Sequence, residues 1–303
     1  MSAVRAGVRW VEDVWGRRVV GVHRLAGGWT STVLRVTADD GERAVLRLMT
    51  KEPWRRHGAE LVRREATVQK RLETTPIPAP RSIAVDLTGE DAGAPAHLMS
   101  WLPGRLCLTS AADDVLERLA RLLAGIHELG AGDERPREYQ SWAPPGKRVV
   151  PPWARQAGLW ERAFEVLEQA PPAYVGTFLH RDFHLGNVLW SQGRVSGVVD
   201  WVETSWGPAD LDVAHAATGT AMLHGPEAAA RFVAACRRPA DEGRYWQIMD
   251  IVGFLPDPAK VVQPWRDAGL DIGDDLARRR LEERLGQVLD GRTAKLDRRT
   301  SNG

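Results

Sequence analysis

The hydrophobic pattern of this chain changes once, from the spacing of strands to the spacing of helices, and that change limits the folds open to it. Short β-type runs with turn signals between them fill most of the first hundred residues, and one segment, 56–73, has helical spacing. Pro103 and Gly104 then break the chain, after which apolar residues recur mainly at helical spacing. We therefore predict an α+β fold with two lobes, a small β-rich lobe (residues 1–101) with one helix and a larger, mainly helical lobe (residues 102–303).

The bulk composition excludes several classes of protein. A formal net charge of +1 argues against a general binder of nucleic acid or membrane surfaces, which carries a large basic excess. The two cysteines, Cys107 and Cys236, form no CxxC pair, which excludes a zinc ribbon and predicts thiols in a reducing compartment rather than a disulfide framework. Charged residues interrupt the N-terminal segment and no long apolar run follows it. We expect a cytoplasmic protein, monomer or homodimer, with no signal peptide and no membrane span.

A polar segment between two β-type runs holds the residues with the clearest chemistry. His180-Arg181-Asp182 is followed by four residues and then Asn187, and thirteen residues later Asp200 ends another β-type run. That spacing is typical of a kinase catalytic loop, because phosphoryl transfer needs a carboxylate to receive the acceptor hydroxyl and oxygen ligands for Mg²⁺. We predict that Asp182 is the base and that Asn187 and Asp200 are the metal ligands. A hairpin between the two β-type runs would bring these last two residues together.

Three motifs together resemble the aminoglycoside phosphotransferase family, relatives of protein kinases that also include choline and homoserine kinases. They are His180-x-Asp182-x-His184-x-Gly186-Asn187-Val188-Leu189, Val199-Asp200-Trp201 and Gly207-Pro208-x-x-x-Asp212-x-Ala214. The resemblance implies a bilobal, protein-kinase-like fold and an enzyme that moves the γ-phosphoryl of ATP or GTP, with Mg²⁺, to a hydroxyl of a small molecule. It also implies that His180 and Asp212 support the catalytic loop. The third motif departs from the family pattern, because it lacks the aspartate that follows the glycine there.

The resemblance extends to a nucleotide site in the first lobe. Its residues are a glycine-rich loop (Gly28, Ser31, Thr32), a strand cation with its helix partner (Arg47, Glu65) and the segment beside the base (Met99, Ser100, Trp101, Leu102). Lysine is scarce in this chain, and none of its five lysines occupies the strand position that protein kinases give to lysine, because Arg47 stands there. Arginine presents a planar fork where lysine presents a point charge, so the two residues hold phosphates differently.

The phosphate acceptor stays open in the sequence. Glu203 and Asp210 lie near the predicted site and suit a cationic acceptor, and by resemblance the acceptor is an antibiotic, as in resistance kinases, or a biosynthetic metabolite. Two other functions also stay open. One is a nucleotide-binding pseudokinase that regulates without transferring phosphate. The other is a metal-dependent hydrolase with His180, Asp182 and His184 as ligands and His215 downstream.

Overall fold

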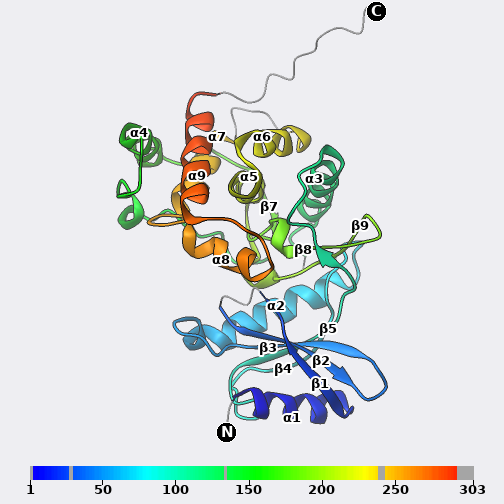
Figure 1. Ribbon diagram of the computed structural model, residues 1–303. Helices are drawn as coiled ribbons and strands as arrows, with labels where there is room; N and C mark the ends of the chain where they lie inside the picture. The colour runs from blue at the N-terminus through cyan, green and yellow to red at the C-terminus, as the bar shows by residue number, and fades with distance from the viewer. Residues whose placement is uncertain (1–2, 27–29, 133–134, 238–242, 292–303) are drawn as a thin grey trace, which may run out of the picture. The chain divides into compact units, whose positions relative to one another are not determined.

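The computed structural model describes residues 3–26, 30–132, 135–237 and 243–291, which divide into two units (Figure 1). Unit 1 comprises Met1–Leu108, Gly186–Thr204 and Gln263–Asp271, and unit 2 comprises Thr109–Leu185, Ser205–Val262 and Ile272–Gly303. Unit 1 therefore includes two segments that lie beyond the predicted lobe boundary between residues 101 and 102. The assignment of nucleotide binding to one lobe and catalysis to the other stays a prediction.

Unit 1 is built on an antiparallel five-stranded sheet in the order β1-β2-β3-β5-β4. The strands are β1 (Val19–Arg24), β2 (Thr32–Ala38), β3 (Arg43–Leu48), β4 (Ser82–Asp86) and β5 (Ala96–Ser100). Leu34, Leu46 and Leu98 lie opposite one another on three neighbouring strands. Because side chains alternate between the two faces of a strand, this register gives the sheet one apolar face. The cross-strand pair Arg47 and His97 lies on the other face.

A helix that the sequence analysis did not predict, α1 (Ala3–Trp15), covers the apolar face. Trp10 and Val11 are buried there, and Gly7 allows a close approach, since a Cβ at this position would lie 3.1 Å from a leucine of β3. The prediction of a single helix in the β-rich part is therefore wrong. Helices α1 and α2 (Gly58–Leu72) lie on opposite faces of the sheet (Figure 1). Apolar residues recur at helical spacing along α1, and its stability depends on packing that face against the sheet.

The predicted helix over 56–73 is confirmed as α2, which follows the short 3-10 helix η1 (Trp54–His57). The buried face of α2 includes Glu65 and Gln69 and packs against β4 and β5. Gln69 Nε2 donates a hydrogen bond to Met99 Sδ at 2.9 Å. The face of the sheet that carries Arg47 is therefore covered by a helix that brings a carboxylate to it.

Unit 1 also contains a smaller sheet, in the order β6-β8-β9, which is connected to the Pro103-Gly104 turn. Its strands are β6 (Arg105–Leu106), β8 (Val188–Ser191) and β9 (Arg194–Val198), and the predicted hairpin between the last two is present. Gly104 has φ +123°, and a Cβ on it would lie 2.3 Å from Ser196 Oγ, so only glycine fits there. Ser196 Oγ in turn donates a hydrogen bond to the carbonyl of Pro103 at 2.6 Å, which links the Pro103-Gly104 turn to the hairpin.

Unit 2 is mainly helical and centres on α5 (Asp210–His224), which is buried from Asp210 to Met222. Helices α6, α7 and α9 pack around it (Figure 1). The remaining elements are α3 (Asp113–His127), η2 (Pro145–Lys147), α4 (Ala157–Glu168), β7 (Gly176–Leu179), η3 (Leu185–Asn187), η4 (Trp201–Glu203), β10 (Ser205–Pro208), α6 (Pro226–Ala235), α7 (Arg244–Gly253), α8 (Ala259–Asp267) and α9 (Asp274–Leu289), of which η4 belongs to unit 1 while η3 and α8 have residues in both units. In the part of the chain that the structure describes, no helix has both the length and the apolar character of a membrane span.

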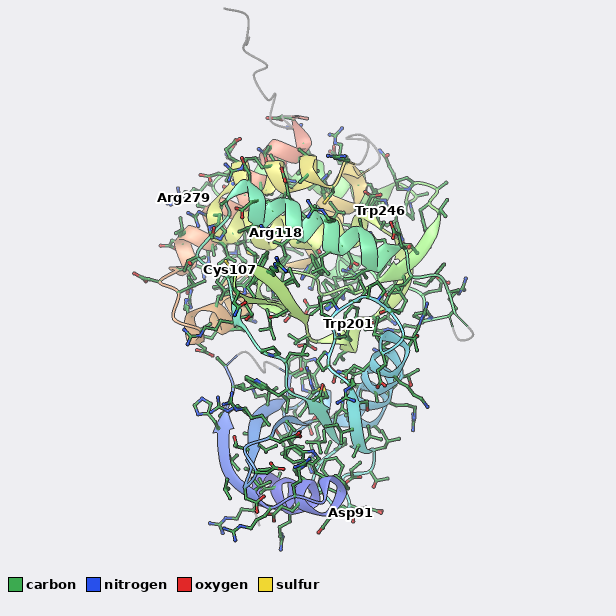
Figure 2. The ribbon with its side chains drawn as sticks, turned by 90° about the vertical axis from the view of Figure 1, so that its right-hand side faces the viewer. Asp91, Cys107, Arg118, Trp201, Trp246 and Arg279 are labelled. Carbon is green, nitrogen blue, oxygen red and sulfur yellow. The ribbon has the colours of Figure 1, made fainter. Side chains whose placement is uncertain are left out.

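Aromatic side chains fill part of the interior of unit 2. Trp246 on α7, labelled in Figure 2, is 2% exposed and meets the rings of Tyr139 and Tyr174 edge to face, with centroids 5.8 and 5.7 Å away. Such edge-to-face contacts add specific geometry to the burial of a large apolar surface. These contacts account for one of the thirteen tryptophans as core packing.

Candidate active site

The segment that contains Asp182 follows strand β7 in unit 2 and is held by the start of helix α5. Asp212 Oδ2 accepts a hydrogen bond from the backbone N–H of His180 at 2.9 Å, and Asp212 Oδ1 accepts one from that of Arg181 at 2.7 Å. Arg181 adopts φ +73°, a left-handed conformation that costs free energy in a non-glycine residue. The fully buried carboxylate of Asp212 therefore holds a strained turn directly before Asp182.

The side chain of His127 supports the carboxylate of Asp212. His127, the last residue of α3, places Nε2 3.1 Å from Asp212 Oδ2. Burial alone would raise the pKa of Asp212, but the contacts with His127 and the hydrogen bonds from the loop backbone outweigh burial and lower it. His127 ends an apolar stripe in the sequence, a pattern that predicts only a core histidine. Its link to the predicted catalytic loop depends on Asp212, a residue 85 positions away.

Asp182 itself lies between two histidines. Its Oδ1 is 3.1 Å from Nε2 of His215, on α5, and 3.7 Å from Nε2 of His184. Its side chain is 31% exposed. Burial would raise the pKa of Asp182, yet the neighbouring histidines, His184 first, lower it far below the usual range of a carboxyl. Asp182 is therefore ionised across the whole neutral range and is able to accept a hydrogen bond from a hydroxyl.

The two histidines carry different charges. Burial, together with His215, lowers the pKa of His184 to about 4, so this ring is neutral at pH 7. Burial would also lower the pKa of His215, but Asp250 and Asp182 raise it to about 9. The second ring nitrogen of His215, Nδ1, is hydrogen-bonded to Oδ1 of Asp250 on α7, at 3.0 Å. Asp250 was missed in the sequence, although a lone carboxylate within the apolar run 248–252 is a signal that could have found it.

This arrangement differs from the ligand set of the hydrolase alternative. Among the described residues, one group of three histidine, cysteine or carboxylate side chains has its ligand atoms within 4.8 Å of one another, and its members are Asp182, His184 and His215. His180 is not in this group, because its Nδ1 faces the backbone and accepts a hydrogen bond from the N–H of Asp182 at 3.2 Å. The triad of His180, Asp182 and His184 on which the hydrolase rested is therefore not assembled.

Unit 1 carries the residues predicted to contact the nucleotide phosphates, centred on Arg47. The guanidinium of Arg47 places Nε 3.3 Å from Glu65 Oε2 and Nη2 3.2 Å from Asp200 Oδ1. Burial would raise the pKa of Glu65, but Arg47 and then His97 outweigh burial and lower it. Because one planar fork reaches two carboxylates, the arginine performs a bridging contact that a lysine ammonium does not reproduce.

His97 completes this network and was missed in the sequence. Its Nδ1 lies 3.1 Å from Glu65 Oε2, and its Nε2 lies 2.9 Å from Ser82 Oγ. The ring and the Glu65 carboxylate are both fully buried. A histidine alternating with apolar residues on a strand is a weak signal, and only the register that sets it opposite Arg47 reveals its role.

The β8–β9 hairpin places Asn187 and Asp200 at its open end. The backbone N–H of Val199 donates to the carbonyl of Asn187 at 2.9 Å, so Asn187 is joined to the residue directly before Asp200. Asp200 adopts φ +66° and its side chain is 36% exposed, whereas Asn187 is 8% exposed. Trp201, labelled in Figure 2, is buried beside it and donates from Nε1 to the carbonyl of Val198 at 2.9 Å.

The remaining nucleotide-site predictions fall at several places in unit 1. Ser31 is buried, and the hydroxyl of Thr32 is 2.8 Å from that of Thr50. Gly28 lies outside the described residues. The backbone N–H of Ser100 donates to the carbonyl of Arg81 at 2.9 Å, so this donor is already used.

The other predicted positions are also accounted for. Met99 is buried under α2, and Arg35 lies over the ring of Trp101, 5.7 Å from its centroid. Leu102 packs against Gly197, where a Cβ would lie 2.6 Å from the leucine side chain. Of the two acceptor-side candidates, Glu203 ends η4 in unit 1 and Asp210 begins α5 in unit 2, where it is 7% exposed.

Comparison with known proteins identifies the family of this chain and its fold. The model of the phosphotransferase enzyme family, APH, matches residues 21–247. No curated protein matches the chain. Among solved structures, macrolide 2′-phosphotransferase type I is similar with a TM-score of 0.62 and 18% identity, covering 93% of this chain and 97% of its own.

Two aminoglycoside phosphotransferases are similar as well. A thermostable mutant of APH(4)-Ia, in ternary complex with ADP and hygromycin B, has a TM-score of 0.61 and 16% identity, covering 94% of this chain and 98% of its own. The GDP and kanamycin complex of APH(2″)-IIia has a TM-score of 0.59 and 12% identity, covering 93% and 96%. At these identities the structures show a shared α+β kinase-like fold. Because the family model spans most of the chain, this protein belongs to the phosphotransferase enzyme family and is a small-molecule kinase.

Proposed function

We propose that this enzyme moves the γ-phosphoryl group of ATP or GTP to a hydroxyl of a small molecule, with Asp182 as the residue that receives the hydroxyl. The observation that carries the proposal is the Arg47 fork, which joins the helix carboxylate Glu65 to Asp200, a predicted metal ligand. Phosphoryl transfer depends mainly on positioning and on positive charge beside the phosphates. A buried cation fixed between two carboxylates supplies such a charge in a set orientation.

Asn187 and Asp200 suit Mg²⁺ by their chemistry. An amide oxygen and a carboxylate oxygen are hard ligands of the kind that Mg²⁺ prefers, and both residues stand at the open end of one hairpin. We assign the metal to these two residues. When bound, Mg²⁺ neutralises charge on the phosphate oxygens. The rest of the chemistry falls to the side chains of the chain itself.

Asp182 prepares the acceptor. Its carboxylate is ionised and accepts a hydrogen bond from the acceptor hydroxyl, which directs an oxygen lone pair at the γ-phosphorus. The new oxygen–phosphorus bond forms as the bond from the γ-phosphorus to the β–γ bridging oxygen breaks. The hydroxyl proton passes to Asp182 and then to solvent, and ADP or GDP leaves with the bridging oxygen.

The nucleotide site that we propose uses residues between Gly28 and Leu102. Arg47 contacts the phosphates, held by Glu65, while Gly28, Ser31 and Thr32 belong to the loop that covers them. Backbone atoms of Ser100, Trp101 and Leu102 hold the base beside Met99, and Ser100 contributes its carbonyl because its N–H is bonded to the carbonyl of Arg81. Residues 1–101 then form the nucleotide lobe, and residues 102–303 carry the catalytic loop and the acceptor pocket.

The acceptor we propose is an antibiotic or a biosynthetic metabolite that bears a free hydroxyl. The structurally similar phosphotransferases with hygromycin B and with kanamycin support the first of these classes. Glu203 and Asp210 would meet an ammonium group on such a molecule. Since the nucleotide is a cytoplasmic metabolite, the proposal also places the enzyme in the cytoplasm.

A nucleotide-consumption screen tests the function. The full-length protein is incubated with Mg²⁺ and either ATP or GTP against panels of aminoglycosides, macrolides, amino alcohols and sugars, and mass spectrometry then seeks a product one phosphoryl group heavier. A phosphorylated product from any acceptor confirms transfer and excludes the pseudokinase. Nucleotide binding without transfer to any member of a broad panel, under conditions where a family enzyme is active, would contradict the proposal.

A further inference from the structure

One buried histidine in unit 2 joins the predicted catalytic carboxylate to a second, deeper carboxylate. His215 on α5 directs Nε2 at Asp182 Oδ1, 3.1 Å away, and Nδ1 at Asp250 Oδ1, 3.0 Å away. Asp250 lies on α7 and its side chain is fully buried. Because Asp250 and Asp182 raise the pKa of His215 to about 9, both ring nitrogens carry a proton at pH 7 and both donate, so the ring is an imidazolium.

Aromatic side chains pack against the ring of His215 in addition to its two hydrogen bonds. Phe254 stacks on it with centroids 5.7 Å apart and planes 12° apart, and Trp142 meets it edge-on at 5.1 Å. His184 approaches from the catalytic loop, with ring centroids 5.8 Å apart. Contacts on these sides leave the imidazole little freedom to rotate, so the direction of its Nε2–H is fixed.

We propose that His215, backed by Asp250, is a positioning residue that fixes the carboxylate of Asp182 for the acceptor hydroxyl. This inference rests on the proposed function, in which Asp182 receives that hydroxyl. A hydrogen bond to Oδ1 from a clamped cation sets the plane of the whole carboxylate and therefore the direction in which Oδ2 points. Misdirection of one reacting oxygen is costly, because transfer needs the hydroxyl oxygen and the phosphorus in line.

The charge of His215 also limits how Asp182 works. A cation at hydrogen-bond distance makes Asp182 a weak base, so the carboxylate orients the hydroxyl and takes its proton only as the oxygen–phosphorus bond forms. The charged or titratable groups that face His215 are Asp182 and His184 from the catalytic loop and Asp250 from α7, and Lys147 acts on the pair through its attraction to Asp250. Loss of the His215 proton removes the bond that directs Asp182.

Histidine NMR on the full-length protein tests the bridge without nucleotide or acceptor. With ¹⁵N-labelled histidine, we expect one ring to keep both protons up to about pH 9 and its signal to vanish in His215→Asn. Asp250→Asn should move that titration to lower pH. Asp114→Asn, which changes an exposed aspartate on α3, is the matched control and should leave the signal in place. A His215 ring that is singly protonated at pH 7 would overturn the inference whether or not the enzyme transfers phosphate.

Kinetics then test positioning with the acceptor that the screen identifies. In Asp250→Asn we expect kcat to fall about 10- to 100-fold, the cost of weakening a hydrogen bond to a charged group, while the KM for nucleotide stays unchanged. The alkaline limb of the pH profile should move to lower pH together with the NMR titration. A wild-type kcat that stays flat while His215 loses its proton would show that the histidine is only structural. Asp114→Asn again serves as the control.

Discussion

Arg47 on β3 and Asp200 at the end of the β8–β9 hairpin form an ion pair, with Nη2 of the arginine 3.2 Å from Oδ1 of the aspartate. The same guanidinium binds Glu65 through Nε. The position predicted to correspond to the lysine of protein kinases thus carries a side chain able to hold a helix carboxylate and a predicted metal ligand at once. The scarcity of lysine in this chain has a structural counterpart at this one site.

The first prediction concerns that fork. Arg47→Lys keeps the charge but supplies only a point donor, which cannot hold Glu65 and Asp200 in the same geometry. We expect kcat/KM for nucleotide to fall about 10- to 100-fold, the cost of losing one or both of the ion pairs that the buried Arg47 side chain makes with Glu65 and Asp200. The measurement is the steady-state rate against nucleotide concentration. Arg55→Lys, an exposed arginine of η1, is the control and should be neutral. Equal rates in Arg47→Lys and the wild type would mean that charge alone matters.

The second prediction separates the two carboxylates. Asp182→Asn cannot accept a proton, so turnover should drop by about 10²- to 10⁴-fold while nucleotide binding is kept. Asp200→Asn removes a metal ligand and a partner of Arg47, so Mg²⁺-dependent nucleotide binding should weaken instead. Isothermal titration with a non-hydrolysable nucleotide, with and without Mg²⁺, distinguishes them. Wild-type turnover in Asp182→Asn would refute the mechanism.

The third prediction concerns the support of the catalytic loop. His127→Leu removes the imidazole from Asp212 and leaves part of a buried carboxylate unsatisfied. We expect the free energy of unfolding to fall by about 1–3 kcal/mol. Urea denaturation gives this value, with His57→Leu, an exposed histidine of η1, as the control. Equal losses in the two variants would show that the contact with Asp212 contributes nothing.

The local parts of this site could be predicted from the sequence, because local patterns specify them. The hairpin that carries Asn187 and Asp200 follows from two β-type runs with a turn between them, and the helix that carries Glu65 follows from its apolar spacing. What sequence reasoning missed depends on contacts between distant segments. His97 meets Glu65 only through the register of β3 and β5, and Asp250 meets His215 only because α7 packs on α5.

The helix α1 was missed for a different reason. Its apolar residues recur at helical spacing, a local signal that was overlooked among the charged residues, and they become buried only against the sheet. Isolated helices of this length are marginal in water, so local propensity carries little of the information. The alternating pattern of the strands shows that one face of the sheet is apolar, but it does not show which segment of the chain covers that face.

The last prediction is a maximum of stability near pH 6.5, which arises from two histidines that titrate in opposite directions. The pKa of His215 is raised to about 9, so its contribution is fully present below the unfolded value of 6.5 and is lost as pH rises through 9. The pKa of His184 is lowered to about 4, so the unfolded chain takes up a proton that the folded chain refuses, and stability falls as pH drops from 6.5 toward 4.

Each limb should amount to about 1–3 kcal/mol. Urea midpoints measured between pH 5 and pH 9 give the curve. His215→Asn should flatten the alkaline limb of the stability curve. His184→Asn should flatten the acid limb at pH values above those at which carboxyl groups titrate. A wild-type stability that rises from pH 6.5 to pH 9 would contradict the bridge between Asp182 and Asp250. Because a ring that binds its proton more tightly in the folded chain than in the unfolded chain stabilises the fold less as it deprotonates, that rise would leave no place for an imidazolium at His215.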